Sequence, residues 1–326
     1  MTTESKTESK AESKAIETRQ LTKRYKGLTA VDNLNLSIPA GTLYGFIGPN
    51  GAGKTTTIRM LAGLLTPTSG EILIDGEPIT HNPQRARWLV GYMPDFFGVY
   101  NDMKVWEYLD FFARCYSLPA ERRTAVIAEL LELVDLSEKR EAFVESLSRG
   151  MRQRLCLAHA LVHDPKILLL DEPASGLDPR ARIEMRELLR ELGRMGKTVL
   201  ISSHILSELA EMCDAVGIIE RGKLLASGPV EEIARAASAD RLLSVQLLHM
   251  NESTLAHATK TLQAYAGVND IFENENHLEI IFTGDQEAAS HLLRYLIEEN
   301  VPVLSFSEAT SNLEEIFLNV TKGQVQ

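Results

Sequence analysis

The sequence predicts a mixed α/β protein in which a parallel sheet carries helices on its faces and a small α+β domain follows. Short apolar runs at residues 42–48, 166–171 and 197–202 each adjoin a helical pattern, and strands that alternate with helices form parallel sheets. After residue 240 the patterns follow the order strand, helix, strand, strand, helix, strand, which is the split βαβ arrangement. We therefore expect two domains of different architecture.

The composition is that of a globular protein with an acidic surface. The chain has 326 residues, of which 44% are hydrophobic and 24% charged, and its formal net charge is −11. At about 150 residues per domain this length predicts two domains, and the negative charge argues against a nucleic-acid partner, which needs a basic surface. No apolar run reaches the ~20 residues that span a bilayer, and the three cysteines are isolated, which argues against a zinc or redox site.

Charge and hydrophobicity set the expected domain limits. Residues 1–15 form a charged, TESK-like repeat with almost no apolar side chain, and because such a segment cannot bury a core we predict a disordered tail. Residues 240–326 carry 13 acidic and 4 basic residues, a change in composition that indicates a boundary near residue 239. The larger domain is thus expected over 16–239 and the smaller one over 240–326.

Within the larger domain, the strand at 42–48 runs into a glycine-rich turn and then a helix over 54–63. Residues 95–164 interrupt the strand–helix alternation with three successive helical patterns, and we expect a helical insertion there. Its helices are predicted at 104–117, 120–135 and 150–163.

The smaller domain is expected to have the ferredoxin-like βαββαβ fold, with a hairpin turn at residues 273–276. Its strands are predicted at 242–248, 268–273, 277–283 and 301–306, its helices at 252–266 and 285–299, and a last helix at 312–321.

The turn after the first strand carries a phosphate-binding pattern. Residues 48–55 read GPNGAGKT and fit G-x-x-x-x-G-K-[ST], the P-loop of nucleoside triphosphatases, between a predicted strand and a predicted helix. The glycines let backbone N–H groups converge on a phosphate, and the helix N-terminus adds its dipole. Lys54 is expected to reach the β- and γ-phosphates, and Thr55 to bind Mg²⁺. The expected nucleotide contacts of this loop are Asn50, Gly51, Ala52, Gly53, Lys54, Thr55 and Thr56.

A second half of the site is expected where the strand at 166–171 ends. An apolar strand carries Asp171 and Glu172 to the carboxyl edge of the sheet, where ligands bind in open α/β folds. Asp171 is expected to hold Mg²⁺ through a water molecule, whereas Glu172 suits a base that polarises the attacking water. The alternative, two solvated carboxylates that end a strand, loses weight beside a phosphate loop.

Together with four further patterns, these motifs resemble the nucleotide-binding subunit of the ATP-binding cassette (ABC) family over about residues 16–238. Residues 147–151 read LSRGM where the family has its LSGGQ signature, and residues 175–178 read SGLD like its D-loop. His204 follows a buried strand as the family's switch histidine does. Tyr25 precedes the phosphate loop where the family stacks an aromatic ring on adenine.

The resemblance implies a head-to-tail dimer of cassettes with two ATP–Mg²⁺ held between them, the second cassette being another copy or a relative. Ser148 and Gly150 would contact the γ-phosphate held by the opposite subunit, and Asp178 would belong to the D-loop contacts of the nucleotide site. His204 would donate a hydrogen bond to the γ-phosphate and sense its loss.

Two positions depart from the family pattern. In the signature, Arg149 and Met151 replace a glycine and a glutamine, while Ser148 and Gly150 remain. Asp95 stands where most members have a glutamine; its carboxylate can offer oxygen to Mg²⁺ or water, so we count it as a metal-binding and catalytic candidate with one extra charge.

The leading interpretation is the ATPase of a bacterial membrane exporter of the drug, lipid, polysaccharide or ion type. The resemblance implies a separate membrane-spanning permease subunit and a place at the cytoplasmic face of the membrane, with no nucleic-acid partner. The alternatives are a soluble ABC ATPase that acts on nucleic acid or ribosomes, and an ATP-binding switch with low turnover. The C-terminal domain resembles the accessory domain of such exporters, for which we expect a regulatory or dimer-supporting role, a passive stabilising role being the alternative.

The segment after Asp95 is expected to face the permease. Phe96, Phe97 and Tyr100 lie close together in a glycine-containing loop that can hardly bury them within itself, and exposed apolar clusters mark partner surfaces. The alternative is that these rings fold back onto the helical insertion.

Overall fold

The computed structural model describes residues 13–96, 98, 102–237, 240–249, 251–274 and 277–308. The chain divides into two compact units, Met1–Val230 and Glu231–Gln326. The division falls at the start of helix α8 (Val230–Ala237), and the boundary predicted near residue 239 lies just beyond the end of this helix.

A six-stranded sheet forms the centre of the first unit. Its order is β11-β10-β4-β9-β8-β7; the five strands from β10 to β7 run parallel, and β11 pairs antiparallel with β10. The apolar runs predicted as strands are β4, β8 and β9, and each is buried along its whole length. The strands are β4 (Leu43–Ile47), β7 (Val90–Met93), β8 (Ile167–Asp171), β9 (Thr198–Ser203), β10 (Ala215–Glu220) and β11 (Lys223–Pro229).

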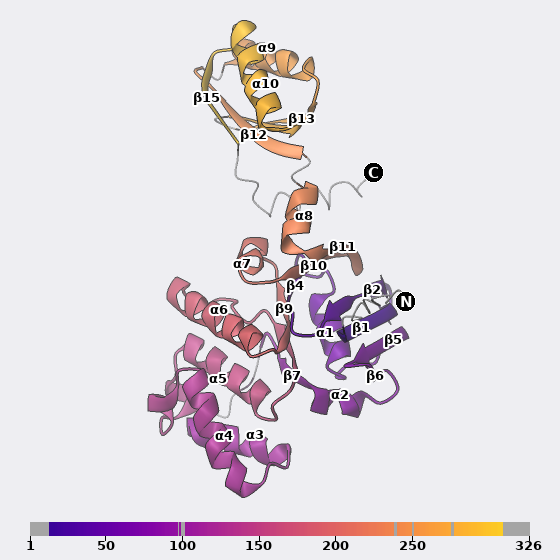
Figure 1. Cartoon of the computed structure of the whole chain (residues 1–326), viewed down its shortest axis with the longest axis vertical. Coiled ribbons are helices and arrows are strands. Elements are labelled where there is room, and N and C mark those ends of the chain that lie inside the picture. The colour runs from indigo at the N-terminus through magenta and orange to yellow at the C-terminus, as the bar shows by residue number, and fades with distance from the viewer. Residues whose placement is uncertain are drawn as a thin grey trace, which may run out of the picture. The chain divides into compact units, whose positions relative to one another are not determined.

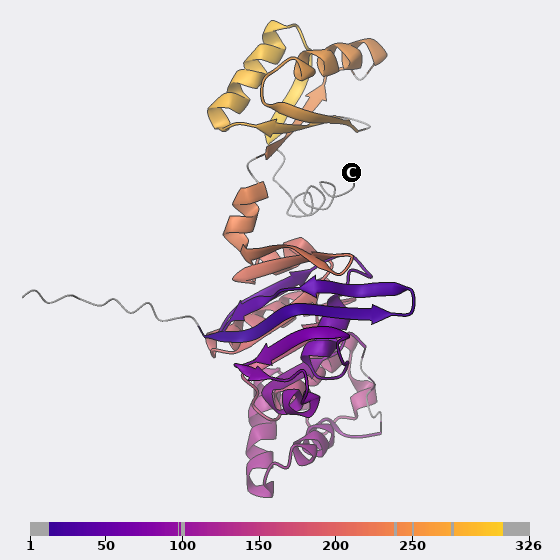
Figure 2. The same ribbon diagram turned by 90° about the vertical axis from the view of Figure 1, so that its right-hand side faces the viewer.

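A second, antiparallel sheet was not among the predicted elements. Its path is β2-β1-β5-β6, with β3 paired to β1, and Figure 2 shows its long strands β1 and β2. Apolar side chains from both sheets and from helix α1 (Lys54–Leu61) share one core. The strands are β1 (Lys14–Tyr25), β2 (Leu28–Leu34), β3 (Ser37–Pro39), β5 (Ser69–Ile74) and β6 (Glu77–Pro78).

The last two residues of the segment predicted as a tail lie in a strand. Strand β1 begins at Lys14, so Lys14 and Ala15 belong to the sheet instead of a tail. Ala15 is buried, and the Asp75 amide donates to its carbonyl, which explains why this end of the segment is ordered. Residues 1–12 lie outside the described residues.

The helical insertion is present. Helices α3 (Val105–Cys115), α4 (Ala120–Leu133) and α5 (Arg149–Leu161) match the three predicted helical patterns and pack against one another (Figure 1). Short 3₁₀ turns at Ser137–Lys139 and Val144–Ser146 join α4 to α5. The remaining helices of the first unit are α2 (Pro83–Leu89), α6 (Pro179–Arg194) and α7 (Leu206–Ala210). Within the described residues, no helix is long and apolar enough to cross a membrane.

The second unit has the predicted βαββαβ order. Its antiparallel sheet has the order β13-β14-β12-β15, and α9 and α10 lie on one face of it (Figures 1 and 2). The elements are β12 (Asp240–Leu247), α9 (Glu252–Gln263), β13 (Val268–Glu273), β14 (Leu278–Thr283), α10 (Gln286–Glu298) and β15 (Val303–Glu308). The helix predicted over 312–321 lies outside the described residues.

Candidate active site

Three neighbouring strands of the parallel sheet bring their carboxyl ends together. Strand β9 lies between β4 and β8, and its register pairs Ser203 with Ile47 on one side and Ser202 with Asp171 on the other. The loops that follow these strands line a groove of about 430 Å³. The predicted site residues that line it are Tyr25, Asn50, Gly51, Ala52, Gly53, Lys54, Thr55, Thr56, Asp95, Glu172 and His204.

The loop between β4 and α1 leaves a helix N-terminus open to an anion. Gly51 and Gly53 have φ values of 83° and 108°, which residues with a side chain rarely adopt. A Cβ on Gly53 would also come within 2.5 Å of the Ala30 carbonyl oxygen. Gly53 is the N-cap of α1, and no side chain caps the helix. The first amides of α1 therefore remain available to a negatively charged ligand.

Lys54 is buried in this loop, with only 6% of its side chain exposed. Its Nζ donates to the Gly48 carbonyl at 2.6 Å and to the Pro49 carbonyl at 3.3 Å, and it lies 3.5 Å from Oε1 of Glu172. These partners satisfy the ammonium group, which a buried cation requires. They also hold it at the end of the loop, next to the amides of α1.

Asp171 is buried at the end of β8. Its Oδ1 accepts a hydrogen bond of 2.7 Å from Ser202 Oγ, whereas its Oδ2 is buried without a hydrogen-bond partner among the described residues. Since a buried carboxylate oxygen without a partner is costly, Oδ2 fits a cation or the water bound to one. No group of three or more His, Cys, Asp or Glu side chains able to hold a metal is found in the described part of the chain.

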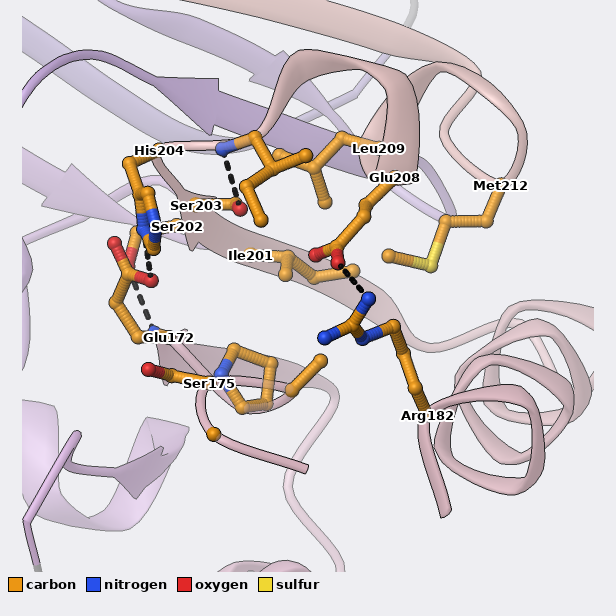
Figure 3. A pocket seen from close by; sticks show the side chains of 14 residues that line it. Glu172, Ser175, Arg182, Ile201, Ser202, Ser203, His204, Glu208, Leu209 and Met212 are labelled. Carbon is orange, nitrogen blue, oxygen red and sulfur yellow. Dashed lines mark hydrogen bonds and ion pairs between the residues drawn. The ribbon is translucent and has the colours of Figure 1, made fainter. Parts of the chain in front are cut away.

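The side chain of Glu172 points toward His204 (Figure 3). Its φ of 53° ends the strand, and its Oε2 lies 2.9 Å from Nδ1 of His204 while Oε1 lies near Lys54. One carboxylate thus joins the lysine and the histidine, and its position between them suits a proton acceptor at the rim of the groove.

Asp95 lies at the same rim, and Tyr25 at the far side. Desolvation and then the negative charges of Asp171 and Glu172 raise the pKa of Asp95 above its ordinary value, while the charges of Arg149 and His204 oppose the rise. Tyr25 is half exposed, and Nζ of Lys23 lies 5.3 Å from the centre of its ring. The ring therefore has a free face that can stack on a base.

Four predicted site residues are not part of the groove lining: Asp171, which is buried at the end of β8, and Ser148, Gly150 and Asp178. Ser148 is the N-cap of α5 and accepts from the Met151 amide at 3.3 Å. Asp178 caps α6 in the same way and accepts from the Ala181 amide at 3.0 Å. Ser148 and Gly150 of the signature therefore lie outside the groove that the phosphate loop lines.

Residue-by-residue prediction missed two polar contacts of the site. Ser202 bonds to both Asp171 and Glu172, and the pair of serines before His204 was the available signal for a polar strand end. Arg149 donates from Nη2 to the Ser175 carbonyl at 3.1 Å, which ties the signature to the D-loop turn of the same chain. That contact joins distant segments, so only the fold reveals it.

A smaller pocket of about 210 Å³ adjoins Glu172, Ser175 and His204. Figure 3 shows that the paired side chains of Arg182 and Glu208 lie at its other end, 3.1 Å apart. This ion pair links α6 to α7, the helix that follows His204.

A parallel sheet of this order, with a buried lysine in the loop after β4, is the architecture of the P-loop nucleoside triphosphatases. Comparison with solved structures agrees. A structure titled as the ATP-binding subunit of an ABC transporter is similar with a TM-score of 0.62 and 29% identity, over 69% of this chain and 93% of that one. The dimeric structure of MJ0796, a bacterial ABC transporter cassette, is similar with a TM-score of 0.60 and 25% identity, over 66% of this chain and 98% of that one.

Sequence families match both units. Residues 31–175 match the ABC transporter family, and residues 228–321 match the C-terminal domain of DrrA1-3-like ATP-binding proteins. The Nod factor export ATP-binding protein I of Burkholderia orbicola (strain AU 1054) is 37% identical over 95% of this chain and 98% of its own length. The linearmycin resistance ATP-binding protein LnrL of Bacillus subtilis (strain 168) is 31% identical over 94% and 98%. The bacitracin transport ATP-binding protein BcrA of Bacillus licheniformis is 35% identical over 94% and 97%.

The chain therefore belongs to the ATP-binding subunits of the ABC transporter family, in the exporter group. It is an ATPase whose hydrolysis of ATP drives transport. The predicted cassette fold, family and exporter function are confirmed, and the comparisons give no support to the alternatives of a nucleic-acid or ribosome ATPase and a low-turnover switch.

Proposed function

We propose that this chain binds ATP with Mg²⁺ in the groove beside β4 and hydrolyses it in a head-to-tail dimer, with another copy or a related cassette. The observation that carries the proposal is the arrangement of Lys54, Asp171 and Glu172, which places a cation, an unpartnered carboxylate oxygen and a base at one helix N-terminus. Mg²⁺ bound to Asp171 and Thr55 would neutralise charge on the phosphates. The loop Asn50–Thr56 would hold the phosphates through its amides.

The residues of the chain then divide the work. The Lys54 ammonium exchanges the Gly48 and Pro49 carbonyls for the β- and γ-phosphates. A carboxylate oxygen of Glu172 accepts the proton of the water that attacks the γ-phosphorus, and the bond to the ADP oxygen breaks. His204, oriented through its Nδ1 by Glu172, donates from Nε2 to the γ-phosphate. Asp95 contributes an oxygen to the water or metal on the same side.

The signature supplies the other wall of the site from the opposite subunit. Ser148 and Gly150 stand at the exposed N-terminus of α5, outside the groove of their own chain, and a helix N-terminus favours an anion such as the γ-phosphate. Asp178 belongs to the D-loop that accompanies them. The cassette MJ0796, to which this chain is similar, is dimeric, which supports a site formed by two cassettes.

The test is Glu172→Gln, which keeps the shape of the side chain and removes the base. With ATP and Mg²⁺ we expect a dimer by light scattering, while turnover falls by about 10²–10⁴-fold, the range for loss of a general base. Wild type with ATP and EDTA is the control for the role of Mg²⁺. Normal turnover in the variant, or a monomer under all conditions, would contradict the proposal.

We also propose that the chain works at the cytoplasmic face of the membrane through a separate permease subunit, and that the segment after Asp95 contacts it. Phe96 is 89% exposed, which favours a partner surface over packing onto the insertion; Phe97 and Tyr100 lie outside the described residues. Phe96→Ala, Phe97→Ala and Tyr100→Ala should weaken copurification with the permease while the ATPase activity of the isolated chain stays near wild type. Unchanged copurification and transport would count against this contact.

For the C-terminal unit we propose a regulatory or dimer-supporting role. It has its own buried core, and its sequence carries no nucleotide-binding motif. Truncation after residue 239 should leave ATP binding measurable and change the ATP-dependent dimerisation. A truncated cassette that dimerises and turns over like the full chain would favour a passive stabilising domain.

A further inference from the structure

We infer that Ser202 is the positioning residue of the hydrolytic site: one buried hydroxyl orients the carboxylate of Asp171 toward the metal and fixes the backbone of Glu172. The inference rests on the proposed function and adds a residue to it. Ser202 lies near the end of β9, level with Asp171 of β8 in the parallel register. Figure 3 shows it close to Glu172 and His204, next to Ser203.

The hydroxyl of Ser202 makes two hydrogen bonds of opposite sense. Its Oγ donates to Oδ1 of Asp171 at 2.7 Å and accepts from the backbone amide of Glu172 at 3.0 Å. A hydroxyl has one donor and two acceptor positions, so one proton satisfies both contacts without competition. The side chain is fully buried, and bonds to a charged group in such a place are stronger than in water.

The first bond decides which carboxylate oxygen of Asp171 is free. Because Oδ1 is engaged by Ser202, the rotation of the carboxylate is fixed, and Oδ2 is the oxygen left without a partner. That oxygen is the one available to the metal or to its bound water. Without the hydroxyl, both oxygens would lack a partner, and the carboxylate could turn.

The second bond stabilises a backbone conformation that glutamate seldom adopts. Glu172 has a φ of 53°, in the left-handed region that costs a residue with a Cβ about 1 kcal/mol or more. Its amide would have no partner in the sheet at this turn, and Ser202 supplies one. The turn directs the Glu172 side chain away from Asp171 and lets its Oε2 reach Nδ1 of His204 at 2.9 Å.

A buried hydroxyl on a strand can also serve stability alone, and β9 offers a matched case. Thr198, at the other end of the same strand, is buried and accepts from the Gly41 amide at 2.8 Å through its Oγ1. It has the same chemistry without the carboxylates. Thr198→Val removes a comparable hydrogen bond far from the site and keeps the shape of the side chain.

The experiment measures ATP affinity in full-length protein with Mg²⁺ and with EDTA, by equilibrium binding to the chain carrying Glu172→Gln, so that no hydrolysis occurs. Binding of Mn²⁺ followed by electron paramagnetic resonance is the second readout. We expect Ser202→Ala to lower the affinity for ATP with Mg²⁺, and for Mn²⁺ in the presence of ATP, by about tenfold, the loss of one charge-assisted hydrogen bond. ATP binding in EDTA should remain unchanged.

Thr198→Val should lower the melting temperature and leave the ratio of the two affinities at the wild-type value. Ser202→Thr retains the hydroxyl and should keep most of the Mg²⁺ dependence. An unchanged ratio in Ser202→Ala, or an equal loss in Ser202→Ala and Ser202→Thr, would overturn the inference. If the chain with Ser202 intact binds ATP equally well with Mg²⁺ and EDTA, the proposed Mg²⁺ site itself fails, which is a different outcome.

Discussion

The loops before α1 and before α5 both end at a helix N-terminus, but the two N-termini differ in how they are capped and how exposed they are. No side chain caps α1, and the buried ammonium of Lys54 lies beside its free amides. The N-terminus of α5 is capped by Ser148 itself, at an exposed position outside the groove. The N-terminus of α1 is suited to bind an anion in the groove of its own chain. The N-terminus of α5 can contact an anion only when that anion is held by another surface.

The charges around the two ends differ in the same way. Lys54 is held by loop carbonyls and by Glu172, and Asp171 and Asp95 add negative charge nearby. Within the signature, Arg149 is exposed and its guanidinium donates to the Ser175 carbonyl. Lys54 and the carboxylates around it are therefore suited to bind phosphates and a metal. Arg149 instead links two segments of backbone. This difference is what we expect if one nucleotide site is formed by two chains, as proposed above.

The largest expected effect falls on the α1 side. Lys54→Ala removes the only cation among the predicted phosphate contacts, and we expect ATPase activity to fall by at least about 100-fold because charge on the phosphates is then poorly compensated. Steady-state ATPase and nucleotide-binding assays measure it. Lys166→Ala is the control, since Lys166 is an exposed lysine paired with Asp75. Unchanged affinity together with unchanged turnover would refute the site.

The next prediction tests whether the two ends meet only between chains. Homodimers of Lys54→Ala and of Ser148→Arg should each be inactive. Each substitution is present in both chains and therefore damages both nucleotide sites. In a mixed dimer one site keeps Lys54 from one chain and Ser148 from the other. An equal mixture should therefore regain activity, up to about a quarter of wild type when half of the dimers are mixed and one of their two sites works.

The measurement is an ATPase titration in which one variant is added to a fixed concentration of the other. The prediction is confirmed if activity rises with the concentration of the added variant. If the two inactive variants never complement, although each still folds and Ser148→Arg still binds ATP, the signature does not act on the opposite site.

The sequence predicted the two ends unequally, for physical reasons. The loop over residues 48–55 could be placed because its chemistry is local, with glycines, lysine and threonine at fixed spacing between a strand and a helix. Asp171 and Glu172 follow from the rule that apolar parallel strands end at one edge. The contacts of Ser202 and Arg149 could not be placed, because they depend on which strands and turns become neighbours.

The antiparallel sheet escaped prediction for a related reason. Strand β1 contains buried threonines, Thr18 and Thr22, between charged residues, so its hydrophobic pattern is weak. Thr18 is held by hydrogen bonds of its hydroxyl to the backbone of Leu34 and Leu36. In the sequence alone, a buried polar residue that is hydrogen-bonded to a neighbouring strand cannot be distinguished from a surface residue. The C-terminal βαββαβ unit was easier, because each of its elements is short, regular and separated by turn residues.

A third prediction concerns the stability of the cassette at acidic pH, which depends on two histidines at the C-terminal end of α5. Burial lowers the pKa of His163, just beyond the end of α5, to about 4, and burial together with the charge of His163 lowers the pKa of His159 to about 4. The His163 Nε2 lies 3.1 Å from the Val90 carbonyl of β7, and its buried Nδ1 has no partner. A second proton would therefore find no acceptor, and the folded state keeps the ring neutral.

The sign follows from the lowered pKa. Above pH ~6.5 both the folded and unfolded states hold a neutral ring and stability is full, whereas between pH ~6.5 and ~4 the unfolded state binds more protons and stability falls, by up to about 3 kcal/mol for His163. Urea unfolding followed by tryptophan fluorescence reports the cassette, since Trp88 and Trp106 both lie in it. His163→Gln, which keeps a donor for Val90, should flatten this slope, and the exposed His81→Gln should not. An equal slope in His163→Gln would show that other groups govern acid stability.

A fourth prediction concerns the far side of the groove. Tyr25→Ala should weaken ATP binding by about tenfold, because base–aromatic stacking contributes about 1–3 kcal/mol, and should change stability little since the ring is half exposed. Tyr25→Phe and Tyr25→Trp keep a ring and should bind ATP like wild type, and GTP should lose affinity in parallel because stacking accepts any base. If Tyr25→Ala binds ATP normally, the adenine lies elsewhere.

The smallest effect is expected from the hydrogen bond that links the signature to the turn after Glu172. Arg149 replaces a glycine of the family signature, and its Nη2 donates to the Ser175 carbonyl at 3.1 Å while its guanidinium covers Gly176. The Ser175 amide in turn donates to the Glu172 carbonyl at 3.1 Å. A short chain of hydrogen bonds therefore runs from the turn that would contact the partner's phosphate to the base of the chain's own site.

Arg149→Ala removes one hydrogen bond of this chain, worth about 1 kcal/mol, so we expect ATPase activity to fall about fivefold with ATP affinity nearly unchanged, because no phosphate contact of the groove is lost. Arg152→Ala, the same charge one turn further along α5, is the matched control and should have no such effect. Gly176→Ala offers an independent route, since its Cβ would stand 2.4 Å from the Arg149 guanidinium and at a φ of 66°. It should reproduce the loss in wild type and add little to Arg149→Ala. If Arg149→Ala and Arg152→Ala behave alike, or the effects of Arg149→Ala and Gly176→Ala simply multiply, the arginine acts as a surface charge and the two ends communicate by another route.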